Sequence, residues 1–176
     1  MVGLKVVMMS ISSKWEGKTS VIKGDFAEEI CKNYLESFGY TVYKPVTDGP
    51  HCFDNIAMMD KKECVIFEVK AKASRKYYPD TGFNHRHYKE YKAISEKHNM
   101  KVFMFFVDEN RGFIYGGDLA RIEKEIEIKH NNRLLSYPRI EGKIIYFPLS
   151  SMKNVKELSF KEVEYLKKYS NRNYDY

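Results

Sequence analysis

The sequence predicts an α/β protein in which a central mixed β-sheet is flanked by helices. Segments with apolar residues at helical spacing alternate along the chain with short apolar runs of strand length. The expected order is helix, strands, helix, strand, strand, helix, which favours a mixed sheet covered by helices. The 176 residues are 43% hydrophobic and 31% charged, enough for one domain with its own core. Because no repeat or linker divides the chain, we expect a single domain.

The first elements follow from local pattern. Gly24-Asp25 precedes a run with apolar residues at helical spacing, which predicts a helix over 26–37 that Gly39 ends. Residues 40–43 alternate as a strand. Two apolar runs joined by the charged turn 60–63 then predict a β-hairpin.

The later elements are read in the same way. An almost unbroken apolar run at 101–107 predicts a buried central strand. Ser159 and Glu162 form a capping-box pattern before the last helix. The other expected elements are a basic loop over 72–86, a helix over 84–98, a strand over 113–115, a helix over 119–127 capped by Asp118, an irregular polar stretch over 129–143, a strand over 144–149 and a helix over 160–169.

Composition narrows the classes of function. The net charge of +6 suits a polyanionic partner, since neutralised phosphates release counterions. No apolar run approaches the roughly 18 residues that span a bilayer, so we expect no membrane partner. The run at 6–9 is too short for a signal peptide. The three cysteines include no CxxC pair, which favours reduced thiols in a cytoplasmic protein over a zinc site or disulfides.

The most informative residues lie in the hairpin. Side chains of a strand alternate between faces, so Glu68 and Lys70 project together and Val69 points the other way. The hairpin brings Asp54 close to Glu68. Magnesium takes oxygen ligands, commonly one or two carboxylates together with waters and phosphate oxygens. Asp54, Glu68 and the Val69 carbonyl therefore form a candidate metal site, with Lys70 placed to stabilise transition-state charge.

A plainer interpretation competes with this one. Glu-x-Lys on one face of a strand is common and often means a solvated ion pair, so Glu68 and Lys70 alone would not indicate a site. The context changes the balance. Asp54 lies 14 residues upstream, a helix that carries Glu28 precedes both, and a basic aromatic loop follows.

This arrangement resembles the P-D-(D/E)-x-K nuclease superfamily. The segment 24–28 looks like its Glu-bearing helix motif, Asp54 matches its Asp, and residues 68–70 match its (D/E)-x-K. Phe53 stands where the motif has Pro. The resemblance covers about residues 20–116 and implies a restriction-endonuclease-like fold, with Mg²⁺ as cofactor and Mn²⁺ as its substitute.

The resemblance also implies roles for two helical residues. Glu28 would support the metal site, although Asp25-x-x-Glu28 also fits a helix-capping pair. His87 is the best match for a polar residue, frequently Gln, that begins the next helix in related nucleases. We therefore expect an N-terminal strand or arm over 1–19, a catalytic core over 20–116, and a C-terminal elaboration with a short frayed tail over 117–176.

Four basic residues are candidates for binding nucleic acid. Beside a phosphate-cutting site they would contact the backbone, although charge runs are usually solvated. They are Lys72, Arg75, Lys76 and Arg86.

The expected function is that of a metal-dependent endonuclease acting on DNA, resolvase-like or virus-encoded, with structure-selective or weak sequence specificity. A homodimer is compatible with the resemblance, and the segment 6–11 would suit its interface. Two alternatives stay open: a nucleic-acid-binding module of the same fold without turnover, and an RNA-directed nuclease.

Overall fold

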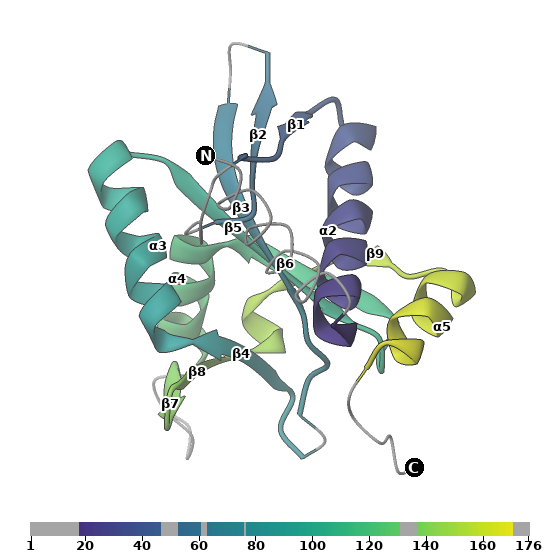
Figure 1. The fold of residues 1–176 in the computed structure, drawn as a ribbon. Helices are drawn as coiled ribbons and strands as arrows, with labels where there is room; N and C mark the ends of the chain where they lie inside the picture. The colour runs from purple at the N-terminus through teal and green to yellow at the C-terminus, as the bar shows by residue number, and fades with distance from the viewer. Residues whose placement is uncertain (1–17, 47–52, 61–62, 76, 131–136, 171–176) are drawn as a thin grey trace, which may run out of the picture.

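The computed structural model describes residues 18–46, 53–60, 63–75, 77–130 and 137–170, and its centre is a six-stranded sheet (Figure 1). Neighbouring strands are antiparallel except β3 and β5, which are parallel. The predicted central mixed sheet flanked by helices is confirmed. In spatial order the strands are β1 (Thr41–Tyr43), β2 (Asn55–Met59), β3 (Glu63–Ala71), β5 (Lys101–Asp108), β6 (Phe113–Asp118) and β9 (Lys153–Glu157).

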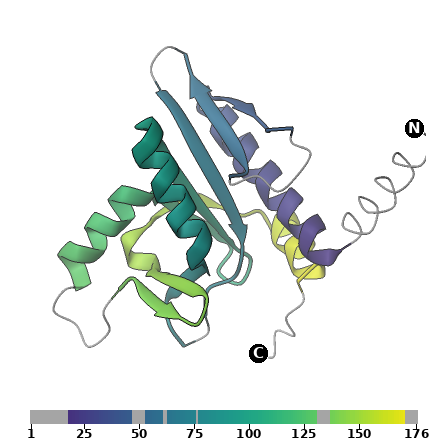
Figure 2. The ribbon, with the colours of Figure 1, turned by 60° about the vertical axis from the view of Figure 1, so that its left-hand side comes forward.

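Helices cover both faces of this sheet, as Figure 2 shows. One face packs against α2 (Thr19–Ser37) and α5 (Phe160–Lys168), and the other against α3 (His85–His98) and α4 (Leu119–His130). Successive residues of β3 serve the two cores in turn. Val65, Phe67 and Val69 enter the α2 core, whereas Ile66 enters the α3 core. The alternation therefore directs Glu68 and Lys70 to the α3 face.

The predicted start of the first helix is wrong. The helix begins at Thr19, with Lys18 as its N-cap, and runs through Gly24. One reason is tertiary: Lys23 is buried on this added turn and its Nζ lies 2.5 Å from Oε1 of the buried Glu109, just after β5. The predicted end is confirmed, because Gly39 has a φ of +88° and its N–H donates to the Glu36 carbonyl at 2.9 Å.

Part of the predicted basic loop is also wrong. It contains β4, which pairs with one later strand at the edge of a small three-stranded antiparallel sheet. Gly82 argued against a strand in the sequence, because glycine weakens strand interiors. The pairing nevertheless requires a glycine there, since a Cβ would lie 2.2 Å from the Ile145 carbonyl oxygen. This sheet contains β4 (Asp80–Asn84), β8 (Ile144–Pro148) and β7 (Arg139–Glu141), and the 3₁₀-helix Leu149–Ser151 follows β8.

Several local predictions are confirmed by their hydrogen bonds. The helix expected over 84–98 begins one residue later, because Asn84 is its N-cap and accepts from the Arg86 N–H, and Asn99 ends it in the left-handed conformation. Ser159 and Glu162 form the expected capping box of α5. The irregular stretch expected over 129–143 was too broad, because β7 occupies part of it, and β9 was not predicted.

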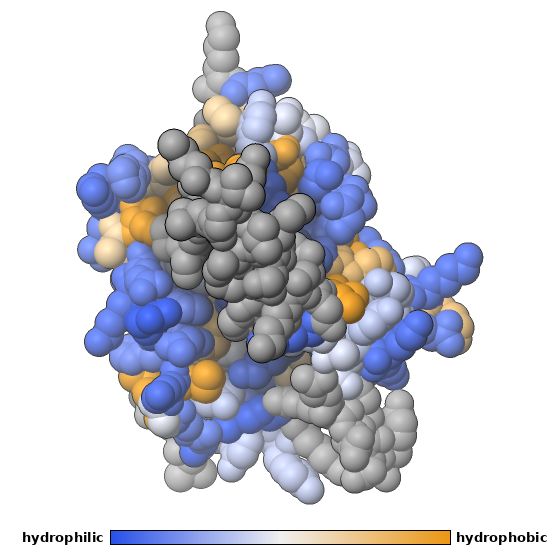
Figure 3. All heavy atoms as spheres, in the orientation of Figure 1, coloured by the Kyte–Doolittle hydropathy of each residue, from blue (hydrophilic) through white to orange (hydrophobic). Residues whose placement is uncertain are grey.

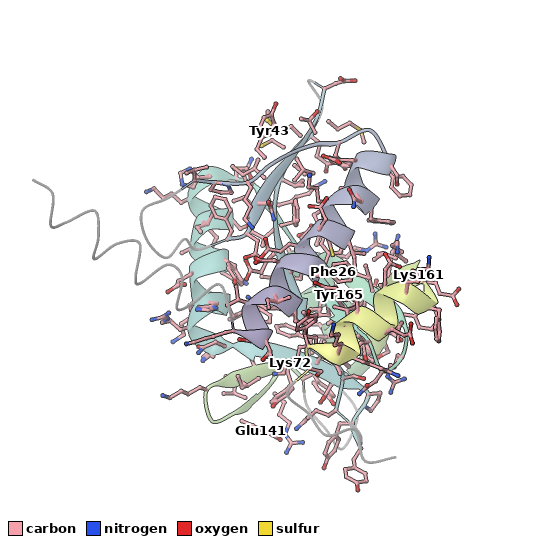
Figure 4. The ribbon with its side chains drawn as sticks, turned by 45° about the vertical axis from the view of Figure 1, so that its right-hand side comes forward. Phe26, Tyr43, Lys72, Glu141, Lys161 and Tyr165 are labelled. Atoms are coloured by element: carbon pink, nitrogen blue, oxygen red, sulfur yellow. The ribbon has the colours of Figure 1, made fainter. Side chains whose placement is uncertain are left out.

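Aromatic packing joins α5 to α2 on their shared face of the sheet. The rings of Phe26 and Tyr165 are 4.2 Å apart, and Figure 4 shows them side by side. Most of the expected N-terminal arm, including the segment 6–11, lies outside the described residues, and so does most of the expected frayed tail. The last two residues of the arm, Lys18 and Thr19, belong to the start of α2. None of the helices within the described ranges combines the length and the apolar character that crossing a membrane requires.

Candidate active site

The candidate site lies where β2 stops, while β3 continues beside β5. Strand pairing between β2 and β3 ends at Asn55–Phe67. Beyond that point none of the described residues pairs with the β3 backbone on the β2 side, and the Val69 N–H donates instead to Oδ2 of Asp54 at 2.7 Å. Because the N–H and C=O of one strand residue point to the same side, the Val69 carbonyl faces this open edge too.

Glu68 is the buried centre of the site. Only 3% of its surface is exposed. The Asp54 N–H donates to its Oε2 at 3.1 Å, and the Lys70 ammonium donates to its Oε1. The Asp54 carboxylate thus accepts from the backbone of β3, and the Glu68 carboxylate accepts from the backbone of Asp54. The two predicted carboxylates therefore meet at one end of the hairpin. Burial of the Glu68 carboxylate is tolerable because hydrogen bonds and an ammonium compensate its lost hydration.

Tyr91 is a member of the site that the sequence did not reveal as one. It is 2% exposed on α3, and the Glu68 carboxylate lies beside its hydroxyl. Burial and the neighbouring Glu68 charge raise the pKa of Tyr91 above its ordinary value, which keeps the hydroxyl a donor. The available signal was its spacing: Tyr91 lies four residues after His87, on the same helix face.

His87 lies at the rim of the same group. Its ring centre is 6.2 Å from that of Tyr91, and its Nε2 is 3.3 Å from Nη2 of Arg86. Burial, followed by the charge of Lys70, lowers the pKa of His87 below its ordinary value, so its neutral form is favoured. A neutral imidazole beside the site can accept or donate a hydrogen bond without adding charge.

Glu28 approaches the site from the opposite face, on α2. Its Oε2 accepts from Nζ of Lys44 at 2.9 Å. Burial raises the pKa of Glu28, the Lys44 hydrogen bond opposes that rise, and the nearby Asp54 charge adds to it. The capping alternative is excluded, because Asp25 and Glu28 lie inside a helix that begins at Thr19.

The site offers few protein oxygen ligands for a hard divalent cation. Among the described residues, no three His, Cys, Asp or Glu side chains are grouped to hold a metal ion. Asp54 and Glu68 provide two carboxylates, and the Val69 carbonyl adds a neutral oxygen. This set fits Mg²⁺, which usually keeps several waters and takes one or two protein carboxylates.

The predicted nucleic-acid-binding residues divide into separate groups. Arg75 is engaged within the chain: its guanidinium binds both oxygens of the buried Asp80, at 2.7 and 2.6 Å, and Oε2 of Glu141 at 2.7 Å. Lys72 donates to the Gly82 carbonyl at 3.1 Å. Figure 4 shows Lys72 and Glu141 at the same end of the molecule. Arg86 is exposed, with Glu90 3.5 Å away, and Lys76 lies outside the described residues.

Comparison with known proteins finds similarity in solved structures. No family model and no curated protein matches the chain. The chain is similar to a Holliday junction resolvase, Hjc from Archaeoglobus fulgidus, at 9% identity and a TM-score of 0.49, over 72% of this chain and 95% of that one.

Two further structures are similar over most of their length. The bacterial homing endonuclease I-Ssp6803I has 16% identity and a TM-score of 0.43, over 75% of this chain and 76% of that one. The nuclease D212 from a fusselovirus has 11% identity and a TM-score of 0.43, over 96% and 94%. At such identities only the fold is compared, and function has to be inferred from the chain's own site.

Proposed function

We propose that this protein is a divalent-metal-dependent nuclease that hydrolyses phosphodiester bonds in DNA. The observation that carries the proposal is the interlocked group of Asp54, Glu68 and Lys70 at the open edge of β3. Two carboxylates and an ammonium converge there, and a buried tyrosine hydroxyl lies beside the central carboxylate. A solvated surface ion pair, the plainer interpretation, does not account for a Glu68 that is 3% exposed.

The metal would be Mg²⁺, with Mn²⁺ as a substitute. Asp54, Glu68 and the Val69 carbonyl would hold it, and it would supply Lewis-acid stabilisation of phosphoryl charge. The chain's own groups do the positioning. The Val69 N–H fixes Oδ2 of Asp54, and the Asp54 N–H and the Lys70 ammonium fix Glu68. This arrangement leaves little reorganisation for the moment of reaction.

Lys70 would act on charge that develops during cleavage. In hydrolysis a water oxygen bonds to phosphorus, one phosphorus–oxygen bond breaks, and the leaving sugar oxygen takes up a proton. Negative charge accumulates on the phosphoryl oxygens, and an ammonium beside Glu68 stabilises it. Glu28 adds negative charge from the α2 side and repels Asp54, so it affects the electrostatic potential at the site. His87 would contact substrate or water at the rim.

Cleavage assays on matched variants test the proposal. Plasmid, single-stranded and branched DNA, and RNA, are incubated with Mg²⁺, with Mn²⁺ and with a chelator. Cleavage with either metal, lost with chelator, is expected for the wild type. Glu68→Gln should abolish it. Glu63→Gln is the control, because Glu63 lies at the other end of β3, where it pairs with Lys101 at 2.7 Å.

Each alternative gives its own result. Cleavage of RNA alone would assign the enzyme to RNA. Binding of nucleic acid without cleavage under every condition would favour the binding module. Cleavage by folded Glu68→Gln at the wild-type rate would show that the group around Glu68 is not the active site. Fold is checked by comparing the melting temperatures of the two Gln variants with that of the wild type.

A further inference from the structure

A basic groove lies between the start of α3 and the turn that joins β7 to β8. It has a volume of about 580 Å³. No Asp or Glu is among the described residues that line it. We call it the α3 groove, and it is lined by Asn84, His85, Arg86, Lys89, Gly142 and Lys143.

The two sides of the α3 groove are fixed to each other by backbone hydrogen bonds. The His85 N–H donates to the Lys143 carbonyl at 2.8 Å, and Asn84 pairs with Ile144 in the β4–β8 ladder. Gly142 has a φ of +58°, the turn conformation that presents the next residue at the rim. The spacing of the basic side chains is therefore set by the fold.

The charges in the α3 groove are available for a partner. Lys89 and Lys143 are exposed, and neither forms an ion pair with another described residue. The guanidinium of Arg86 is 3.5 Å from Glu90, a solvent-exposed pair of the kind that contributes little. Figure 3 shows mostly hydrophilic residues on the surface over α3. This differs from Arg75, whose guanidinium is bound by two carboxylates.

The α3 groove is connected to the candidate active site through one helix. Arg86, in the groove, is 3.3 Å from Nε2 of His87. The ring of His87 lies 6.2 Å from that of Tyr91, which lies beside Glu68. A nucleic-acid strand bound along these basic side chains would therefore reach the carboxylates of Asp54 and Glu68.

We propose that the α3 groove holds the phosphodiester backbone of the substrate through Arg86, Lys89 and Lys143. This inference rests on the proposed function for its partner, and it moves the main backbone contact from Lys72 and Arg75 to the other side of β4. Exposed cations in a groove with no Asp or Glu among its described lining residues suit a polyphosphate, and the exposed Arg86–Glu90 pair is weak enough to give way to one. The chemistry is shared by DNA and RNA, so the test includes both.

The test compares two charge-matched double variants. Lys89→Ala/Lys143→Ala removes two charges from the α3 groove, and Lys161→Ala/Lys168→Ala removes two exposed charges from α5, on the opposite face of the sheet. Binding of labelled duplex DNA, single-stranded DNA and RNA is measured against salt, with Ca²⁺ in place of Mg²⁺. Lys143→Gln serves as a milder variant, and melting temperatures verify the fold.

The expected change is in the salt dependence. Each phosphate contact contributes about −0.9 to the log–log slope on a duplex and about −0.7 on a single strand. Loss of two duplex contacts means that wild-type affinity falls about 12-fold more than that of the groove variant between 50 and 200 mM salt. The α5 variant should keep the wild-type slope.

The outcomes separate this inference from the proposed function. An unchanged slope in the groove variant, with wild-type cleavage intact, would overturn the α3 groove and leave the nuclease standing. A flattened slope in a protein that never cleaves would support the groove and refute the nuclease. If the wild type binds none of the three nucleic acids, both proposals fall.

Discussion

Asp54 has two separable duties, and a pair of substitutions can separate them. Its Oδ2 accepts from the Val69 N–H at 2.7 Å, and its charge belongs to the candidate metal site. Asp54→Asn keeps an oxygen acceptor of the same shape but removes the charge. Asp54→Ala removes both. We expect Asp54→Asn to melt close to the wild type and Asp54→Ala to be clearly less stable, with neither variant cleaving DNA.

The size of the stability difference follows from the hydrogen bond. An N–H donor to a charged acceptor contributes about 1.5–3 kcal/mol, and a partly buried donor left unpaired costs a similar amount. A loss of about 2 kcal/mol lowers the melting temperature of a chain of this length by about 4 to 8 °C. Scanning calorimetry measures that shift, and single-turnover cleavage with Mg²⁺ measures activity. Full activity in folded Asp54→Asn would refute the role of Asp54 in the metal site. Equal melting temperatures of the two variants would refute the stabilising role of its hydrogen bond with the Val69 N–H.

Three further outcomes are expected at the same site. Lys70→Met should cleave about 100-fold to 1000-fold more slowly while calorimetric Mn²⁺ affinity stays equal or rises, and a wild-type rate would make Lys70 a surface charge only. Tyr91→Phe should lower the free energy of unfolding by about 1–3 kcal/mol in denaturant titration, because it removes the buried donor beside the Glu68 charge, and an unchanged midpoint would show that the hydroxyl does not stabilise Glu68. Burial raises the pKa of Glu28, so the folded state holds its proton more tightly than the unfolded state does. Wild-type stability should therefore fall as pH rises from the ordinary value of 4.5 through the raised one, and Glu28→Gln should remove that fall, which melting temperatures at several pH values would detect or exclude.

The sequence was sufficient for those parts of the site whose geometry is local. The alternation of β3 fixes which residues share a face, and the length of the hairpin decides that Asp54 meets Glu68. Caps are equally local, as the Ser159–Glu162 box shows. Each of these depends on contacts between residues that are near in sequence or in register on paired strands.

The parts that the sequence missed depend on distant partners. β4 contains Gly82 because a strand more than 60 residues later packs against its backbone, and no local pattern reports that contact. The first turns of α2 depend on Lys23 reaching Glu109, 86 residues away. Tyr91 has the pattern of an ordinary core aromatic. Only the packing of α3 on β3 shows that its hydroxyl serves Glu68.

The charges of the site explain why it needs cationic help to meet a phosphate. Two carboxylates and one ammonium, in Asp54, Glu68 and Lys70, leave one net negative charge at the edge of β3. The neighbouring Glu28 is already balanced by Lys44. A phosphodiester brought to this edge would be repelled unless further positive charge were present. The α3 groove supplies fixed positive charge at one side, which attracts the backbone, and a divalent cation between the carboxylates would reverse the sign at the scissile bond. Substrate binding and cleavage therefore call for two different sources of positive charge, and the salt series and the metal series test them independently.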